Sequence, residues 1–128
     1  MRVYYEDTDA GGVVYHSQYL NFLERARTEW LRHAGFEHQT LREQFGLIFV
    51  VHSLQIQFKK PAKLDDMLSI SSQIAKLGRG SFEFFQQISV NQQILIEAQV
   101  KLACVDTFTF KPMAIPAQIR QKMEQLWP

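Results

Sequence analysis

Cysteines, long apolar runs and excess charge of one sign are scarce in this chain, and each scarcity excludes a class of structure or partner. One cysteine among 128 residues excludes an internal disulfide and a cysteine-rich zinc site, and a reducing compartment, the cytoplasm, is the expectation. No apolar run approaches the roughly 20 residues that cross a bilayer, and the N-terminal residues lack the apolar segment of a signal peptide. Lys and Arg number 14 against 13 Asp and Glu, so the net charge of +1 gives no general reason to bind nucleic acid or an anionic membrane.

The composition is otherwise that of one folded domain. Hydrophobic residues make up 46% and charged residues 21%, which excludes intrinsic disorder. No repeat, low-complexity stretch or linker rich in Pro, Gly or Ser divides the chain, and its length is typical of a single domain. Familiar catalytic motifs are absent as well: there is no G-x-S-x-G, no phosphate-binding or dinucleotide-binding glycine loop and no H-E-x-x-H.

The first part of the chain predicts a long helix after a turn. Residues 2–5 are short and β-prone, and in the turn-rich stretch 7–12 two adjacent glycines indicate a positive φ or a close backbone approach. The helix is expected from Ser17, as its N-cap, to about Ala34, with Gly35 just beyond its end. The apolar residues on one face of this helix recur at helical spacing, namely Tyr19, Phe22, Leu23, Ala26 and Trp30.

The rest of the chain predicts a short helix, four strands and a last helix. The short helix is expected from Thr40 to Gly46, and the last one over 117–126 after Pro116. From Ile48 the apolar period becomes two, which predicts antiparallel strands over 48–59, 68–74, 82–90 and 94–104 in meander order. The first strand's apolar face is expected to hold Val50, His52, Leu54, Ile56 and Phe58, with His52 as a core histidine; Cys104 is expected to be a small buried hydrophobe.

Candidate catalytic residues gather just before the long helix. Asp7, Asp9 and His16 lie there beside the two glycines. A helix start has unpaired N–H groups and a partial positive charge, so a carboxylate beside it can act as nucleophile or general base while the N–H groups hold an oxyanion. On composition alone, a turn cap and a solvated charge are the simpler interpretation, because Asp and Gly are common in turns.

A family resemblance shifts this interpretation toward catalysis. Residues 8–16, Thr-Asp-Ala-Gly-Gly-Val-Val-Tyr-His, with Arg2-Val3 before them and Tyr19 after them, resemble the active-site signature of the 4-hydroxybenzoyl-CoA thioesterase family. The longer run 5–16 resembles in particular its YbgC-type branch, the thioesterases linked with the Tol-Pal system. The similarity continues through 22–27 and 61–66 and covers nearly the whole chain. It implies a single α+β domain over 1–128 with the hotdog fold, an antiparallel sheet wrapped around one long central helix.

The same resemblance implies an acyl-CoA thioesterase, which hydrolyses the thioester of a short-chain acyl-CoA to a free acid and coenzyme A. Coenzyme A is then part of the substrate, and acyl carrier protein is an alternative carrier of the acyl group. No metal or bound cofactor is expected. Asp9 would be catalytic, either as nucleophile or as general base, and His16 would act through its imidazole or only through its backbone N–H. The family further implies a homodimer or homotetramer with the site at a subunit interface.

Further residues are expected to bind the substrate. Arg79 and Ser81 lie in the hairpin at which the family holds the nucleotide end. Lys59 belongs to a basic cluster, with Lys60 and Lys63, that is able to meet the phosphates of coenzyme A. The expected binding residues are Gly12, Val13, Tyr15, Lys59, Arg79 and Ser81.

Two other functions stay open at this point. Glu24, on the long helix, is a rival carboxylate, and with His16 it resembles the pair of hotdog dehydratases that act on hydroxyacyl thioesters. The third interpretation is a non-catalytic acyl-binding module in cell-envelope assembly. Hydrolysis of an acyl-CoA distinguishes the thioesterase from both.

Overall fold

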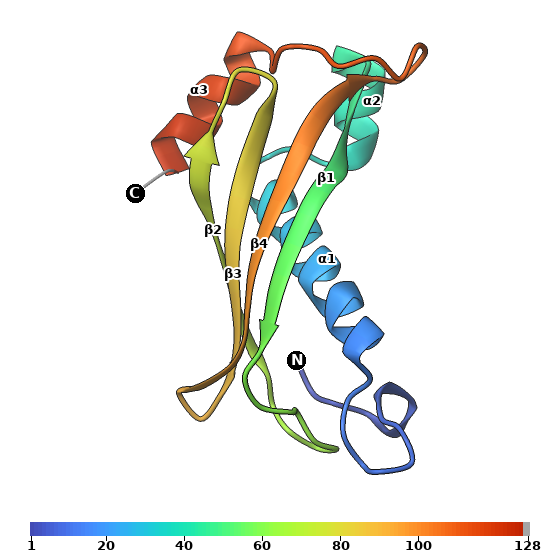
Figure 1. Cartoon of the computed structure of the whole chain (residues 1–128). Helices are drawn as coiled ribbons and strands as arrows, with labels where there is room; N and C mark the ends of the chain where they lie inside the picture. The colour runs from blue at the N-terminus through green and yellow to red at the C-terminus, as the bar shows by residue number, and fades with distance from the viewer. Residues whose placement is uncertain (127–128) are drawn as a thin grey trace.

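The fold combines one four-stranded antiparallel sheet with three α-helices, as the predicted α+β class requires (Figure 1). A computed structural model describes residues 1–126. The longest helix, α1, lies along one face of the curved sheet, and most of the buried apolar residues lie between the two. The elements in chain order are η1 (Tyr5–Asp7), α1 (His16–His33), α2 (His38–Phe45), β1 (Leu47–Phe58), β2 (Ser69–Leu77), β3 (Ser81–Val90), β4 (Gln93–Asp106) and α3 (Ala117–Leu126).

The strand order is β1-β4-β3-β2, so the predicted meander is wrong for the first strand. Two short turns, 78–80 and 91–92, pair β2 with β3 and β3 with β4 as predicted. Neighbouring strands of a sheet lie about 4.8 Å apart, so the connection 59–68 is long enough to cross two strands. It therefore carries the chain past the ends of β4 and β3, and β1 becomes the opposite edge of the sheet (Figure 1).

An irregularity at His52 reverses the alternation of side chains along β1. The pairing with β4 skips this residue, as a β-bulge does. Val51 lies opposite the buried Leu102, and after the bulge Leu54 lies opposite the buried Val100, so both are on the core side of the sheet, although both stay partly exposed at this edge. The prediction that Val50 and His52 share the face of Leu54 was therefore wrong, and His52 is exposed rather than a core histidine.

The N-terminal segment differs from its prediction in two ways. Instead of a strand over 2–5 there is one isolated bridge, between Arg2 and Met67, followed by the 3-10 turn η1. Helix α1 begins at His16 with Tyr15 at its N-cap position, so Ser17 is not the cap, and no side chain caps the helix.

A glycine follows the end of each of the first two helices, as predicted. Gly35 follows α1 with φ +93°, and Gly46 ends α2 with φ +65°. Helix α2 begins at His38, two residues before the predicted Thr40. The single cysteine, Cys104, is fully buried, and no helix within residues 1–126 has the length and apolar character that crossing a membrane demands.

Candidate active site

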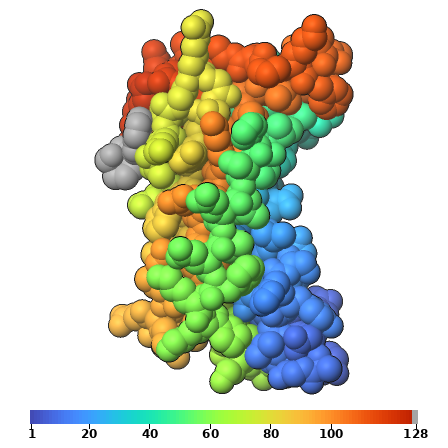
Figure 2. Space-filling view, in the orientation of Figure 1, coloured from blue at the N-terminus to red at the C-terminus, as the bar shows by residue number. Residues whose placement is uncertain are grey.

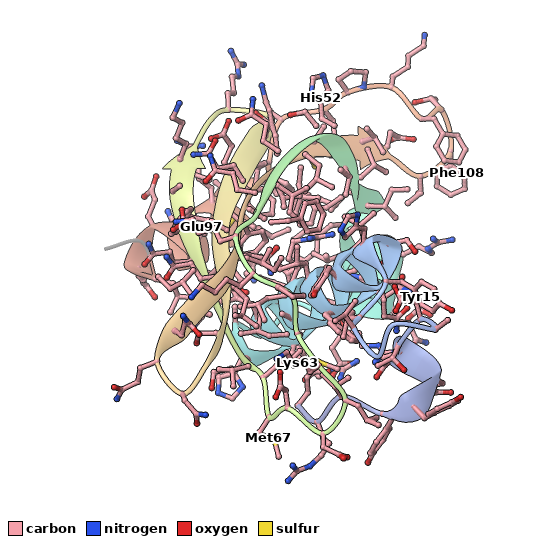
Figure 3. The ribbon with its side chains drawn as sticks, turned by 60° about the horizontal axis from the view of Figure 1, so that its bottom comes forward. Tyr15, His52, Lys63, Met67, Glu97 and Phe108 are labelled. Carbon is pink, nitrogen blue, oxygen red and sulfur yellow. The ribbon has the colours of Figure 1, made fainter. Side chains whose placement is uncertain are left out.

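The candidate site lies at the end of the molecule where α1 begins, which Figure 3 turns toward the viewer with Tyr15 and Lys63 on it. The connection 59–68 holds this end together. Val14 N–H donates to the Ala62 carbonyl at 2.9 Å, and Ala62 N–H donates to the Tyr19 hydroxyl at 2.8 Å. The loop before α1 and the start of α1 are thus both fixed to the same connection.

Burial raises the pKa of the Tyr19 hydroxyl above its usual value, and the hydrogen bond from Ala62 opposes that change in part. The hydroxyl is therefore neutral at physiological pH. It serves as the acceptor that keeps the Ala62 amide satisfied inside the fold.

A tight glycine turn holds the Asp9 carboxylate. Gly12, at φ +80°, donates its N–H to the Asp9 carbonyl at 3.0 Å, and Asp9 N–H donates to the Val13 carbonyl at 2.8 Å. The carboxylate oxygen Oδ1 accepts the Gly11 N–H at 2.8 Å and the Val13 N–H at 3.4 Å. Within residues 1–126 the other oxygen, Oδ2, accepts no hydrogen bond from the protein. One oxygen is therefore fixed and the other is free to react.

The start of α1 presents open donors beside this turn. Tyr15 N–H donates to the Asp7 carbonyl at 3.2 Å and Gln18 N–H to the Tyr15 carbonyl at 3.0 Å. The N–H groups of His16 and Ser17, between them, have no acceptor in the described part of the chain. Because no side chain caps the helix, these two donors and the positive end of the helix dipole are available to a ligand.

A cavity of about 710 Å³ joins the turn, the helix start and the end of β1. The His16 ring stacks on the Phe58 ring, with centroids 4.5 Å apart and planes 30° apart. In Figure 2 the green atoms of this end of β1 and of the connection lie against the blue atoms of the N-terminal turn and the start of α1. The cavity is lined by Asp9, Val13, Val14, Tyr15, His16, Ser17, Tyr19, Phe58, Lys59, Lys60 and Pro61.

Five of the eight predicted site residues line this cavity: Asp9, Val13, Tyr15, His16 and Lys59. Gly12 shapes the turn without lining it.

Arg79 and Ser81 do not line the cavity, because the β2–β3 hairpin that carries them lies at the opposite end of the sheet (Figure 1). There the Arg79 carbonyl accepts the N–H of Ile115, next to α3. Within one chain the length of the sheet therefore separates these two residues from Asp9.

Six of the residues that line the cavity are not among the predicted site residues, and Phe58 and Lys60 are two of them. The sequence predicts Phe58 only as an apolar strand residue, and nothing in the sequence pairs it with His16. Lys60 belongs to the predicted basic cluster, yet the structure gives it a more direct place than Lys59, whose ammonium group forms an ion pair with Glu97 at 2.7 Å. The Pro61 that follows is the one local sign that the strand ends here and turns toward the site.

The other acidic candidates are placed differently. Asp7 is buried, and its two oxygens accept the Gln18 side-chain amide at 2.9 Å and the Tyr4 N–H at 3.0 Å, so it holds the turn. Glu24 is exposed and lines separate hollows along α1 that contain no residue of the Asp9 cavity.

The carboxylate on a glycine turn, beside an uncapped helix that packs on a curved antiparallel sheet, agrees with the resemblance to the hotdog-fold thioesterases. The family model described as "Thioesterase-like superfamily" matches residues 3–123, and the chain belongs to this superfamily. It is similar to the acyl-CoA thioesterase YbgC of Haemophilus influenzae, at 47% identity over 98% of this chain and 93% of that protein.

Two further comparisons agree. The acyl-CoA thioester hydrolase YbgC of Escherichia coli O6:H1 is 46% identical over 98% of this chain and 93% of its own length. The crystal structure of a probable thioesterase from Bartonella henselae superposes with a TM-score of 0.85 at 39% identity, covering 91% of this chain and 95% of that one. The predicted hotdog fold and the resemblance to the YbgC branch are confirmed.

Proposed function

We propose that this chain hydrolyses the thioester of an acyl-CoA, releasing a free acid and coenzyme A. One observation carries the proposal: the free carboxylate oxygen of Asp9 and the uncapped start of α1 belong to the same cavity. The names of the relatives at 46–47% identity, acyl-CoA thioesterase and thioester hydrolase, support the same activity. A nucleophile or base beside preorganised N–H donors is what acyl transfer to water requires.

The proposal gives each part of the cavity a role. The thioester carbonyl oxygen would accept the N–H groups of His16 and Ser17, which stabilise the negative charge that develops on it. Asp9 then follows one of two routes. It attacks the carbonyl carbon, expelling the coenzyme A thiolate and leaving an anhydride that water hydrolyses, or it takes a proton from a water that attacks directly. Both routes give the same products.

The basic residues at the cavity are suited to the coenzyme A end of the substrate. Lys60 lines the cavity and is exposed, so its ammonium group is available to a phosphate, and Lys59 lies beside it. Val13 and Tyr15 would contact the substrate nearer the thioester, and Gly12 keeps the turn in shape. Arg79 and Ser81 lie at the other end of the sheet, so a second copy of the chain is the proposed source of their contribution.

The direct test compares two carboxylates. Asp9→Asn keeps the size of the side chain and removes the nucleophile or base, so kcat for an acyl-CoA should fall by roughly two to four decades while the fold is retained. Glu24→Gln is the matched control and should hydrolyse at nearly the normal rate. The measurement is thiol release with a panel of acyl-CoAs, together with far-UV circular dichroism of each variant.

The other outcomes identify the alternatives. Normal activity in folded Asp9→Asn protein, with loss in Glu24→Gln, would move the site to Glu24. Addition of water to an enoyl thioester without thioester hydrolysis would indicate a dehydratase. Binding of coenzyme A with no turnover of any acyl-CoA would indicate the non-catalytic acyl-binding module.

We propose in addition that the chain assembles as a homodimer through β1. This strand of 12 residues is an edge of the sheet, so one side of its backbone is open to another strand. It also exposes four apolar side chains, with relative exposures of 37% to 51%: Val50, Val51, Leu54 and Phe58. A second copy paired there would place the candidate site, at the end of β1, next to the subunit interface.

Substitutions at two residues of nearly equal exposure test the dimer. Leu54 on β1 is 37% exposed and Ile94 on β4, an interior strand, is 36% exposed. Leu54→Lys should dissociate the assembly, and Ile94→Lys should not, as measured by light scattering over a dilution series. A wild-type chain that is monomeric and active at all concentrations would contradict the proposal. A mass of four chains would extend it to the tetramer.

Four more detailed expectations stay predictions, because they come from the resemblance or from composition. They are a short acyl chain, acyl carrier protein as an alternative carrier of the acyl group, a cytoplasmic location and a link to the Tol-Pal system. The acyl-CoA panel above measures the first, and repeating it with acyl carrier protein thioesters measures the second.

A further inference from the structure

Asp7, which takes no part in the reaction proposed above, holds the start of α1 at two points. Its backbone carbonyl accepts the Tyr15 N–H at 3.2 Å, and its side-chain Oδ1 accepts the Gln18 side-chain amide at 2.9 Å. Tyr15 is the N-cap position of α1, and Gln18 lies in the first turn of the helix. His16 and Ser17, whose N–H groups are open to the thioester carbonyl, lie between these two points. Asp7 therefore fixes the helix on both sides of the two donors.

Further hydrogen bonds keep the Asp7 carboxylate and the Gln18 amide in one orientation. Asp7 is only 5% exposed, and its Oδ2 accepts the Tyr4 N–H at 3.0 Å. An ionised carboxylate only accepts hydrogen bonds, so the Gln18 amide must turn its nitrogen toward Asp7. The oxygen of the same amide then accepts the Asn21 side-chain amide at 2.9 Å. These bonds form one directed chain from Asn21 to the buried carboxylate.

This arrangement does what a helix cap does without occupying the donors. A conventional N-cap side chain steadies the start of a helix, but it accepts an N–H group of the first turn. No side chain caps α1, so the N–H groups of His16 and Ser17 stay open while Asp7 holds the residues on either side of them. Rigid placement matters here, because N–H groups that stabilise an oxyanion must already point to where the charge will develop.

We propose that Asp7 and Gln18 are positioning residues, which hold the N–H groups of His16 and Ser17 in the orientation that receives the oxyanion of the thioester. This role rests on the proposed function. All of the hydrogen bonds that carry it lie within one chain, so none of them needs a second copy.

The test begins with a change of charge at nearly constant size. Gln18→Glu replaces the amide donor with a second carboxylate, which repels Asp7 and removes their hydrogen bond at about pH 8, where both groups are ionised. The two N–H donors then lose part of their fixed direction, and kcat for an acyl-CoA should fall about tenfold to a hundredfold. KM should stay nearly unchanged, because the donors act on the transition state. A loss of stability alone would not lower kcat in protein kept well below its unfolding transition.

A second substitution should restore the activity. Combined with Gln18→Glu, Asp7→Asn reverses the pair: the new amide at position 7 donates to the new carboxylate at position 18. Its oxygen still accepts the Tyr4 N–H, and Asn21 still donates to position 18, so the directed chain survives. The double variant should recover most of kcat.

The matched control makes the same change far from the cavity. The side-chain amide of Gln39 on α2 donates to Glu43 at 3.0 Å, and this pair is exposed. Gln39→Glu also places two carboxylates side by side, and it should leave kcat unchanged.

NMR order parameters of the His16 and Ser17 N–H groups provide a readout that needs no turnover. They should fall in Gln18→Glu and recover in the double variant, since they report how firmly each N–H is held. Unchanged order parameters in Gln18→Glu overturn the proposal, as does a normal kcat when they fall, or a double variant that restores neither. A wild-type chain that hydrolyses no acyl-CoA refutes the proposed function, and the order parameters alone then decide whether Asp7 and Gln18 hold these N–H groups.

Discussion

The hydroxyl of Tyr19 accepts the backbone N–H of Ala62 at 2.8 Å, which joins α1 to the connection that crosses the end of the sheet. Both residues are buried. Tyr19→Phe would leave that N–H buried without an acceptor, at a cost of about 1–3 kcal/mol. We therefore expect Tyr19→Phe to lower the free energy of unfolding by this amount, measured by urea denaturation.

Tyr5→Phe is the control for the loss of a phenol hydroxyl. Tyr5 is 82% exposed, and its hydroxyl makes no hydrogen bond within residues 1–126, so the substitution should leave the urea midpoint unchanged. Equal midpoints for wild-type protein and Tyr19→Phe would show that the Ala62 amide finds another partner.

Substitution of the two glycines of the turn by alanine should have different effects on activity and stability. A Cβ on Gly11 would lie 3.2 Å from Asp9 Oδ1, so Gly11→Ala should displace the carboxylate and lower kcat more than stability. A Cβ on Gly12 meets nothing within 4 Å, but its φ of +80° strains any other residue. Gly12→Ala should therefore lower the free energy of unfolding by about 1–2 kcal/mol. Thiol-release kinetics and urea denaturation of both variants check this, and identical profiles for the two would contradict it.

Periodicity predicted the elements of this fold better than their arrangement. The helix after the turn and the four strands are present close to their predicted bounds, because the alternation of apolar residues reports burial directly. The edge position of β1 was not predicted, since nothing local specifies which strand pairs with which. The bulge at His52 was missed for a related reason: Val50 to Phe58 alternates well in the sequence, and only pairing with β4 reveals the extra residue.

The site shows the same division between local and distant information. Asp9, the glycine turn and the helix start are contiguous in the chain, so the sequence placed them together. The stacking of His16 on Phe58 joins residues 42 positions apart, so it leaves no local signal. Arg79 and Ser81 were assigned from the family pattern alone, and one chain keeps them at the other end of the sheet.

Cys104 should make the free energy of unfolding depend on pH in the alkaline range. Burial raises the pKa of its thiol from 9.0 to about 11. The folded state thus keeps the thiol neutral where the unfolded state ionises, so this contribution to stability is complete below pH 9 and is lost as the pH rises toward 11. The unfolding free energy of wild-type protein should fall more steeply over this interval than that of Cys104→Ala, in which Tyr19 and every other titrating group remain. Parallel declines in urea denaturation would refute the assignment.

His16 offers two groups to the substrate, and one substitution separates them. His16→Ala keeps the backbone N–H at the helix start and removes the imidazole, which lines the cavity against Phe58. We expect kcat to fall on the order of a hundredfold, the usual contribution of a side chain that donates or transfers a proton in the transition state. Phe58→Leu keeps an apolar wall and removes only the ring that orients the imidazole, so it should lose less of kcat. A His16→Ala enzyme with unchanged kcat/KM and pH profile would leave the backbone N–H groups alone to hold the oxyanion.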